Sequence, residues 1–428
     1  MKITMRGFWK ASTVALALGT TFLAGCTMFG ATGSGQTTGG GAAGDPQYTL
    51  EQSISDQAQG MTIAFDGLAF LTGSLGADSF FPPGKVADFW GFQYLRDNDP
   101  SQMGHNTDFL TKASLNMLNV LTSSQRAELA TLAKSQVASI NEYGYNRFVL
   151  MKAFRRLLDG DVPTGATGLD ESAVKAYSAE LYLLDGEMSY ERAEVMGGIL
   201  HVLTTSQRAT LDAMVGRGML EWPTVQEPSE LRALTGDEKV AVMTYAGDLF
   251  SWYAGSIEAD VYFCPERHGT YFGSFYMKDA PAVGNANYSI STTLTGDSGQ
   301  AFLSDLTSAQ AKLVTDLVAV QHPLLLQILD TRRAVATQLR KFISGGKADK
   351  ATVLSLMQTY GELDGEIVYH LATAFCNVGH SLTSAQKTQL LALRSQALGG
   401  FTPTGAFLYS SPIPMPTIPN TDFLFEVP

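Results

Sequence analysis

The stretch Leu121-Thr122-Ser123-Ser124-Gln125 recurs in closely similar form at three other places in this 428-residue chain. The other copies are Leu203-Thr204-Thr205-Ser206-Gln207, Leu306-Thr307-Ser308-Ala309-Gln310 and Leu382-Thr383-Ser384-Ala385-Gln386. In each copy the Thr hydroxyl can accept a hydrogen bond from the amide three residues later, and the Gln side chain can reach back to the Thr amide. Each stretch, called a box below, therefore predicts the start of a helix.

The spacing of the boxes indicates one helical unit written twice. The first two boxes begin 82 residues apart and the last two begin 76 residues apart. Residues 121–160 align without a gap on 306–345, with nine identities in 40 positions, LDGEMSYERA at 184–193 matches LDGEIVYHLA at 363–372, and the aromatic segment 80–97 matches 262–279. We therefore expect an all-α body of two tandem, bundle-like repeats, unit one at 48–225 and unit two at 229–400.

Apolar residues at helical spacing predict helices over 50–76, 107–119, 122–158, 170–201 and 204–217 in unit one. In unit two, Pro323 should kink or break the long helix that follows the third box. Gly160 and Gly345 suit helix C-terminal caps. Signals for strands are weak and confined to 271–292, and the matching aromatic segments read as irregular loops.

The N-terminus has the pattern of a bacterial lipoprotein signal. Lys2, Arg6 and Lys10 precede a short apolar stretch that ends in Leu-Ala-Gly-Cys at 23–26, which resembles a lipobox. The resemblance implies removal of residues 1–25 and acylation of Cys26, with palmitate among the attached chains. Thr27 in the next position implies sorting to the outer membrane. An ordinary secretory signal with an incidental Cys is the alternative.

Residues 26–47 form a Gly, Ser and Thr-rich tether between the acylated Cys26 and the body. No other segment of the sequence reads as long and apolar enough to cross a bilayer. The formal net charge is −12, and removal of the three signal cations makes it −15. Such an acidic chain argues against nucleic acid as a partner and against attraction to an anionic membrane surface.

Charged residues that both units retain are candidates for interhelical ion pairs. Arg147, Arg155, Asp185 and Glu187 recur as Arg332, Arg340, Asp364 and Glu366. Pairs between these arginines and carboxylates on neighbouring helices would fix the register of the helices. The functional alternative is a carboxylate pair for acid–base chemistry or metal binding.

Unit two also gathers side chains that bind transition metals, namely Cys264, His268, His370, Cys376 and His380. Once Cys26 is acylated, two cysteines remain, and an oxidising compartment favours a Cys264–Cys376 disulfide. One alternative is a zinc or copper site made by the Cys and His side chains, and another is two free thiols or cysteines too far apart to meet. No resident cofactor is otherwise expected.

The sequence offers little support for nucleophilic catalysis. It has no Gly-x-Ser-x-Gly, no phosphate loop and only six His, so no catalytic residue is assigned. The aromatic segments could line a ligand groove, although a role in the core is the simpler interpretation. The C-terminal residues 401–428 are rich in Pro and aromatic side chains and predict a tail docked on the body, with an extended recognition arm as the alternative.

Repeated LTxxQ boxes that open helices in an exported protein resemble the periplasmic LTxxQ-motif family, of the Spy and CpxP type. The resemblance covers the box positions, twenty residues in all. It implies an all-α protein that acts as a chaperone, a stress regulator or a metal-responsive factor. This chain is longer than that family, its boxes lie further apart, and its charge is acidic where such chaperones present a basic surface.

Together these features predict a lipoprotein of the cell outer membrane, with the body facing either the periplasm or the cell surface. Its expected function is that of a binding scaffold, or a chaperone-like or assembly factor, with an envelope protein as partner. The first alternative is a metal-binding or metal-responsive envelope protein that uses the Cys and His side chains of unit two. An enzyme of unknown reaction is the third.

Overall fold

The computed structural model describes residues 54–73, 109–215, 221–255, 257, 281–282, 285–289, 298–398, 406–408, 411–413 and 417–427. Several predicted features lie outside these residues. They are the signal (1–25), Cys26, the tether to residue 47, both aromatic segments, Cys264 and His268.

The described part of the chain is predominantly helical, which confirms the all-α prediction. Up to residue 215 its helices are α3 (Asp56–Thr72), α6 (Phe109–Val120), α7 (Ser123–Asp159), α8 (Glu171–His201) and α9 (Thr205–Met214). Those that follow are η3 (Ser229–Ala233), α10 (Gly236–Ala254), α11 (Ser298–Asp305), α12 (Ser308–Thr315), α13 (Leu317–Leu339), η6 (Arg340–Ser344), α14 (Lys350–Ser381), α15 (Ser384–Leu398) and η7 (Asp422–Leu424).

Short strands form three antiparallel pairs among the described residues. β1 (Gly168–Leu169) pairs with β6 (Phe425–Glu426), β2 (Pro281–Ala282) with β3 (Asn285–Ser289), and β4 (Ala406–Leu408) with β5 (Ser411–Ile413). The β2–β3 pair lies within 271–292, where the sequence shows weak strand signals, whereas the other two pairs lie outside that region and are not predicted from the sequence.

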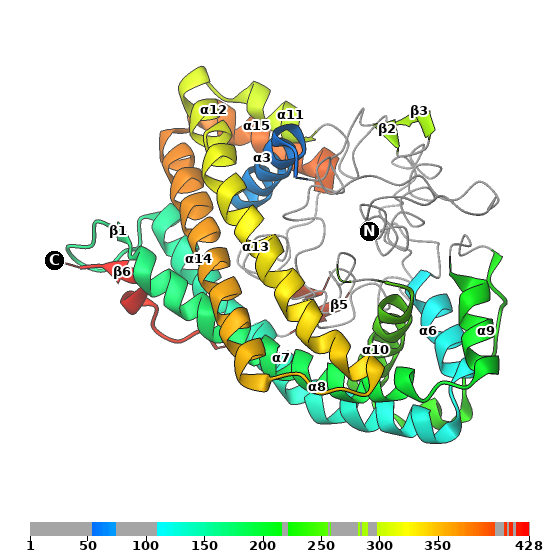
Figure 1. Ribbon diagram of the computed structural model, residues 1–428. Helices are drawn as coiled ribbons and strands as arrows, with labels where there is room; N and C mark the ends of the chain where they lie inside the picture. Colours follow the sequence, from blue (N-terminus) through cyan, green and yellow to red (C-terminus); the bar gives the residue numbers. More distant parts are fainter. Residues whose placement is uncertain are drawn as a thin grey trace.

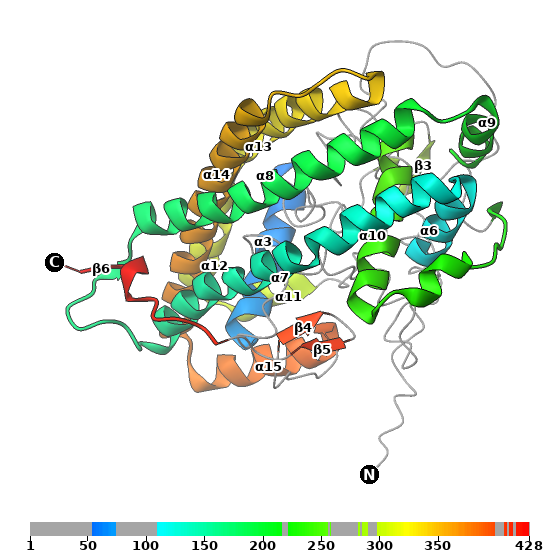
Figure 2. The same cartoon turned by 90° about the horizontal axis from the view of Figure 1, so that it is seen from below.

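The long helices α7, α8, α13 and α14 form the centre of the molecule. Figure 1 shows α13 and α14 side by side, with α14 crossing α8. Figure 2, the view from below, shows α7 and α8 running next to each other, with α6 and α10 against the far end of α7. The shorter helices α3, α11, α12 and α15 gather at the opposite end.

The helices begin and end where local sequence chemistry places their caps. All four boxes form the reciprocal pair of hydrogen bonds between the Thr and the Gln three residues later. Gly160 and Gly345 close their helices at φ 74° and 77°, in the left-handed region that favours glycine. Thr235 and Glu238 form a further capping box at the start of α10, with Glu in place of Gln.

The prediction of a helix break at Pro323 is wrong. Pro323 lies inside the continuous helix α13, and the interruption lies earlier, at Asp316 between α12 and α13. An interior proline removes one helical hydrogen bond. The buried side chains of Leu325 and Ile328, on the next turn, offset that loss by packing in the core.

One stretch of the described chain, Ser308–Ser344, is long and apolar enough to cross a membrane by length and composition. This corrects the expectation that only the signal region has this character. Part of the stretch is buried, and its helix α13 packs along α14 and carries Arg332, which is 5% exposed. A core helix of a folded body passes the same test, so the stretch is weak evidence for a membrane span.

Candidate functional site

The two boxes of each unit meet through their glutamines. The Gln207 side-chain amide donates to Gln125 Oε1 at 2.8 Å and to the Val120 carbonyl at 2.9 Å. In unit two the Gln386 amide donates to Gln310 Oε1 at 2.8 Å and to the Asp305 carbonyl at 3.1 Å. Each Gln–Gln contact joins two helix starts that lie far apart in the sequence.

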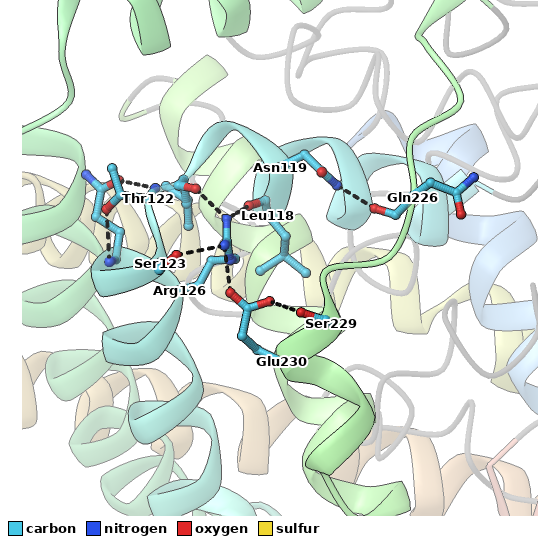
Figure 3. Close-up of polar contacts among 10 residues, drawn as sticks. Leu118, Asn119, Thr122, Ser123, Arg126, Gln226, Ser229 and Glu230 are labelled. Atoms are coloured by element: carbon cyan, nitrogen blue, oxygen red, sulfur yellow. Dashed lines mark hydrogen bonds and ion pairs between the residues drawn. The ribbon is translucent and has the colours of Figure 1, made fainter.

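Charged side chains around the first box fasten the segment that joins the predicted units (Figure 3). Arg126 donates to the Leu121 carbonyl at 2.6 Å and to Glu230 Oε1 at 2.7 Å. The pKa of Glu230 is lowered, mainly because its carboxylate accepts this hydrogen bond from Arg126. Asn119 donates to the Gln226 carbonyl at 2.8 Å, so two contacts hold this segment against the corner between α6 and α7.

The LDGE sequences lie where α8 and α14 cross. A Cβ on Gly361 would come 2.7 Å from Ala179 Cα, and one on Gly365 would come 2.7 Å from Lys175 Cα. Gly186 lies against Met357, a residue near the start of α14. Residue numbers therefore rise on one helix as they fall on the other, and the two helices are antiparallel.

The glutamates of the LDGE sequences form ion pairs across this crossing. Glu187 pairs with Lys350 of α14, and Glu366 pairs with Lys175 of α8. The prediction that the retained arginines pair with these glutamates is wrong, because the cations that meet them are lysines of the other helix. The hydrogen bond that Lys350 donates to Glu187 is the main reason why the pKa of Lys350 is raised.

Asp185 and Asp364, the aspartates of the same sequences, are fully buried. Tyr182 donates its hydroxyl to Asp364 Oδ2 at 2.5 Å, and its ring centroid lies 4.6 Å from that of Tyr360. Asp185 Oδ1 lies 3.8 Å from the Arg192 guanidinium. Buried carboxylates need such partners, because an uncompensated buried charge is strongly destabilising.

The retained arginines are also used inside the protein. Arg155 donates to the Phe70 carbonyl at 2.5 Å, with its guanidinium 4.5 Å from the Phe70 ring centroid. Arg340 donates to the Trp252 carbonyl at 3.1 Å, with its guanidinium 5.8 Å from that ring. These two arginines therefore hold the last turns of α3 and α10.

Arg147 and Arg332, the other retained arginine pair, are both buried. Arg147 has no exposed surface, although it is among the bulkiest side chains of the core. The Arg332 guanidinium lies 5.8 Å from the ring centroid of Tyr360. A guanidinium over an aromatic ring is stabilised by the electrostatic attraction of the ring face.

The predicted Cys264–Cys376 disulfide is not supported. Cys376 is a free thiol, 1% exposed, and its Sγ lies 3.7 Å from the Phe154 carbonyl. Burial raises the pKa of this thiol to about 12. Gly197 is its counterpart in unit one, where a Cβ would come 2.4 Å from Phe342 Cβ. The Cys side chain therefore occupies a packed position in the core.

Among the metal-ligand candidates that the structure describes, His370, Cys376 and His380 do not meet at one point. His380 lies with Nε2 at 3.1 and 3.0 Å from the Leu157 and Leu158 carbonyls at the end of α7. His370 lies on the same helix as Cys376 but six residues earlier, about 9 Å along the axis at 1.5 Å per residue. One ion cannot bind His370, Cys376 and His380 together.

His370 instead meets two glutamates. The ligand atoms of Glu171, Glu366 and His370 all lie within 4.8 Å of one another, and all three residues are half-buried. Sequence reasoning did not single out Glu171. It enters the group only because α8 and α14 cross as antiparallel helices, and the sequence carries no direct signal of that crossing.

The described end of the C-terminal segment packs on the body. Glu426 and Phe425 pair with Gly168 and Leu169, and the buried Phe425 lies beneath the Arg156 guanidinium at 5.2 Å. Arg156 also donates to Asp422 Oδ1 at 2.7 Å. These contacts hold the end of the chain against the loop between α7 and α8.

Comparison of the chain with models of known protein families, with curated proteins and with solved structures finds no match. The resemblance to the periplasmic LTxxQ-motif family therefore stays a prediction that depends on the four boxes. Function has to be inferred from the geometry and charge of the described residues.

Proposed function

We propose that this protein is an outer-membrane lipoprotein whose duplicated helical body is a binding scaffold with a chaperone-like or assembly role in the cell envelope. The observation that supports it best is the use of the repeated motifs. The paired box glutamines and the LDGE residues all make contacts inside the body. Residues retained in both units thus maintain a shape, as a scaffold requires.

The proposed duplication explains why the box contacts occur twice, Gln207 with Gln125 and Gln386 with Gln310. The retained glutamates also pair across the units, Glu187 with Lys350 and Glu366 with Lys175, although the two lysines occupy different positions in the repeats. Two units that exchange contacts in this way would behave as one rigid platform.

The charge of the body indicates the kind of partner. With the signal removed the formal charge is −15, so long-range attraction favours proteins with a basic surface or basic unfolded segments. Such association weakens as salt rises, because screening shortens the range of the attraction to about 8 Å at physiological ionic strength. We therefore propose a basic envelope protein as the partner.

A client assay tests the proposed chaperone-like role. The full mature chain in detergent micelles is added to denatured lysozyme, a basic client, and in parallel to reduced α-lactalbumin, an acidic one, while light scattering follows aggregation. We expect suppression of lysozyme aggregation at low salt, a weaker effect at 0.5 M salt and little effect on α-lactalbumin. Equal scattering with and without the protein for both clients would refute this role.

Mass spectrometry of the N-terminal peptide tests the proposed anchor. We expect the mature chain to begin at Cys26 and to carry acyl chains, palmitate among them, with fractionation to the outer membrane. Cys26→Ser should leave the uncleaved precursor, because the signal is cut before the acylated Cys. An unmodified Cys26 in a mature chain would contradict the lipoprotein proposal without bearing on the fold of the body.

A further inference from the structure

Three ligand-type side chains meet where the start of α8 lies against the middle of α14. Glu171 is the first residue of α8, and Glu366 and His370 lie one turn apart on α14. Residues spaced by four share a helix face, and two ligands at this spacing with a third from another element are a common arrangement for zinc. We propose that Glu171, Glu366 and His370 bind a divalent transition metal ion, with zinc as the expected occupant.

Comparison with the equivalent place in unit one shows what is special about this group. The positions of Glu171, Glu366 and His370 correspond there to Lys350, Glu187 and Glu191. There Lys350 and Glu187 form an ion pair beside Glu191, without an imidazole. Three sequence differences therefore distinguish the proposed site, namely Glu171 for Lys350, His370 for Glu191 and Lys175 for Leu354.

The dimensions of the group suit an ion after a small movement. Zinc binds His nitrogen and carboxylate oxygen at about 2.0–2.2 Å, so tetrahedral ligands lie roughly 3.3–3.6 Å apart. The three ligand atoms here lie within 4.8 Å of one another, and long Glu side chains close such a gap by rotation. Three protein ligands leave a fourth position open to water or to a small ligand.

The charge around the group also favours a cation. The carboxylates of Glu171 and Glu366 bring two negative charges to the group, and the ammonium of Lys175 balances one of them. The Tyr369 ring packs edge-on against His370 at 5.3 Å between centroids. This contact restricts the imidazole, so less conformational entropy is lost when the histidine binds an ion.

Lys175 occupies part of the site in the metal-free protein. Its ammonium pairs with Glu366 and lies 3.8 Å from Glu171 Oε1. A bound ion must take Glu366 away from this ammonium, so Lys175 competes with the metal. The counterpart of Lys175 in unit two is Leu354, and this competing cation is therefore particular to the proposed site.

Zinc titration of the full mature chain in detergent micelles, stripped beforehand with a chelator, tests the proposal. We expect one zinc per chain, at least a hundredfold weaker binding in His370→Ala, and about tenfold tighter binding in Lys175→Met. The expected loss of zinc affinity in His370→Ala exceeds the 10–100-fold loss typical of residues that only support a ligand, because a direct ligand is removed. His322→Ala on α13 is the matched control and should bind as the wild type does.

The gain expected from Lys175→Met cannot come from a misfolded protein, so it keeps the test decisive if His370→Ala proves unstable. Absence of zinc binding in both the wild type and Lys175→Met overturns the proposal. Binding that survives His370→Ala but is lost in Cys264→Ser assigns the metal to the thiol set and also overturns it. Equal affinity for magnesium would show a simple acidic cluster and overturn the zinc site, because zinc, unlike magnesium, prefers a nitrogen ligand.

Discussion

Replacing Gly361 by alanine should destabilise the protein, although alanine is the better helix former. An alanine Cβ would lie 2.7 Å from Ala179 Cα, 2.8 Å from the Ser178 carbonyl oxygen and 2.8 Å from Tyr182 Cβ. Two of these atoms belong to the backbone of α8, so the helices have to move apart. Overpacking costs about 1–3 kcal/mol, and alanine recovers about 1 kcal/mol of helix propensity. Because the obstacle is backbone, we expect a net loss of about 1–2 kcal/mol.

Guanidinium unfolding followed by circular dichroism measures this loss. Gly198→Ala is the matched control, since Gly198 is a helical residue of the last turn of α8, is exposed and has no atom within 4 Å of the place where the alanine methyl group would lie. The same substitution there should stabilise the protein by about 0.5–1 kcal/mol. The two variants should therefore shift the unfolding midpoint in opposite directions. A Gly361→Ala protein as stable as the wild type would refute the close approach of α8 and α14.

Three further outcomes follow from the contacts described above. Gln207→Ala should lower the unfolding free energy by about 1–3 kcal/mol, because it leaves part-buried acceptors unpaired, and an unchanged guanidinium midpoint would argue against the paired boxes. Cys376 should resist iodoacetamide at pH 8 in the folded protein and react on denaturation, as peptide mass spectrometry would show, since burial raises its pKa to about 12. The pKa of Asp422 is lowered first by Asn420 and then by Arg156, so its stabilisation is present above the unfolded pKa and is lost as the pH falls through the lower folded pKa. After correction for the intrinsic exchange rate, amides that flank β1 should therefore be less protected below about pH 4 than at pH 6, and in Asp422→Asn their protection should vary less with pH.

The sequence predicts features that depend on neighbouring residues. The capping boxes and the glycine caps form as expected, because every group they need lies within a few residues along the chain. The box at Thr235 could have been found by the same reasoning, since Glu serves as well as Gln three residues after the cap. The LTxxQ pattern excludes it only because that pattern requires a glutamine.

Features that depend on how distant helices cross could not be predicted in this way. The Gln125–Gln207 contact joins residues 82 positions apart, and nothing near either residue specifies the partner. The same limit applies to Glu171, which reaches His370 only through the antiparallel packing of α8 on α14. For the retained glutamates the sequence predicts arginines as partners, whereas the packing of α8 on α14 brings Lys350 and Lys175 to them.

The number of cysteines favours a Cys264–Cys376 disulfide, but the packing around Cys376 shows why the number alone cannot predict pairing. The thiol is buried in the core, whereas at its unit-one counterpart Gly197 the approach of Phe342 leaves no room for a side chain. Its hydrogen-bond acceptor is the Phe154 carbonyl, so the side chain serves the core. The cysteine count and the redox compartment indicate how many thiols can pair. They do not indicate where each side chain packs.

Differences between the units are therefore more informative about function than the residues they share. Cys376 differs from Gly197 but is buried, so its change adjusts packing and offers nothing to a solute. His370 differs from Glu191 in a half-buried position beside two carboxylates, where an ion from solution can reach it. Two physical reasons therefore point to His370 as the place where the proposed scaffold could bind a metal ion. Its side chain is half-buried, and the crossing of α8 and α14 does not require a histidine, because Glu187 and Lys350 form an ordinary ion pair at the equivalent place.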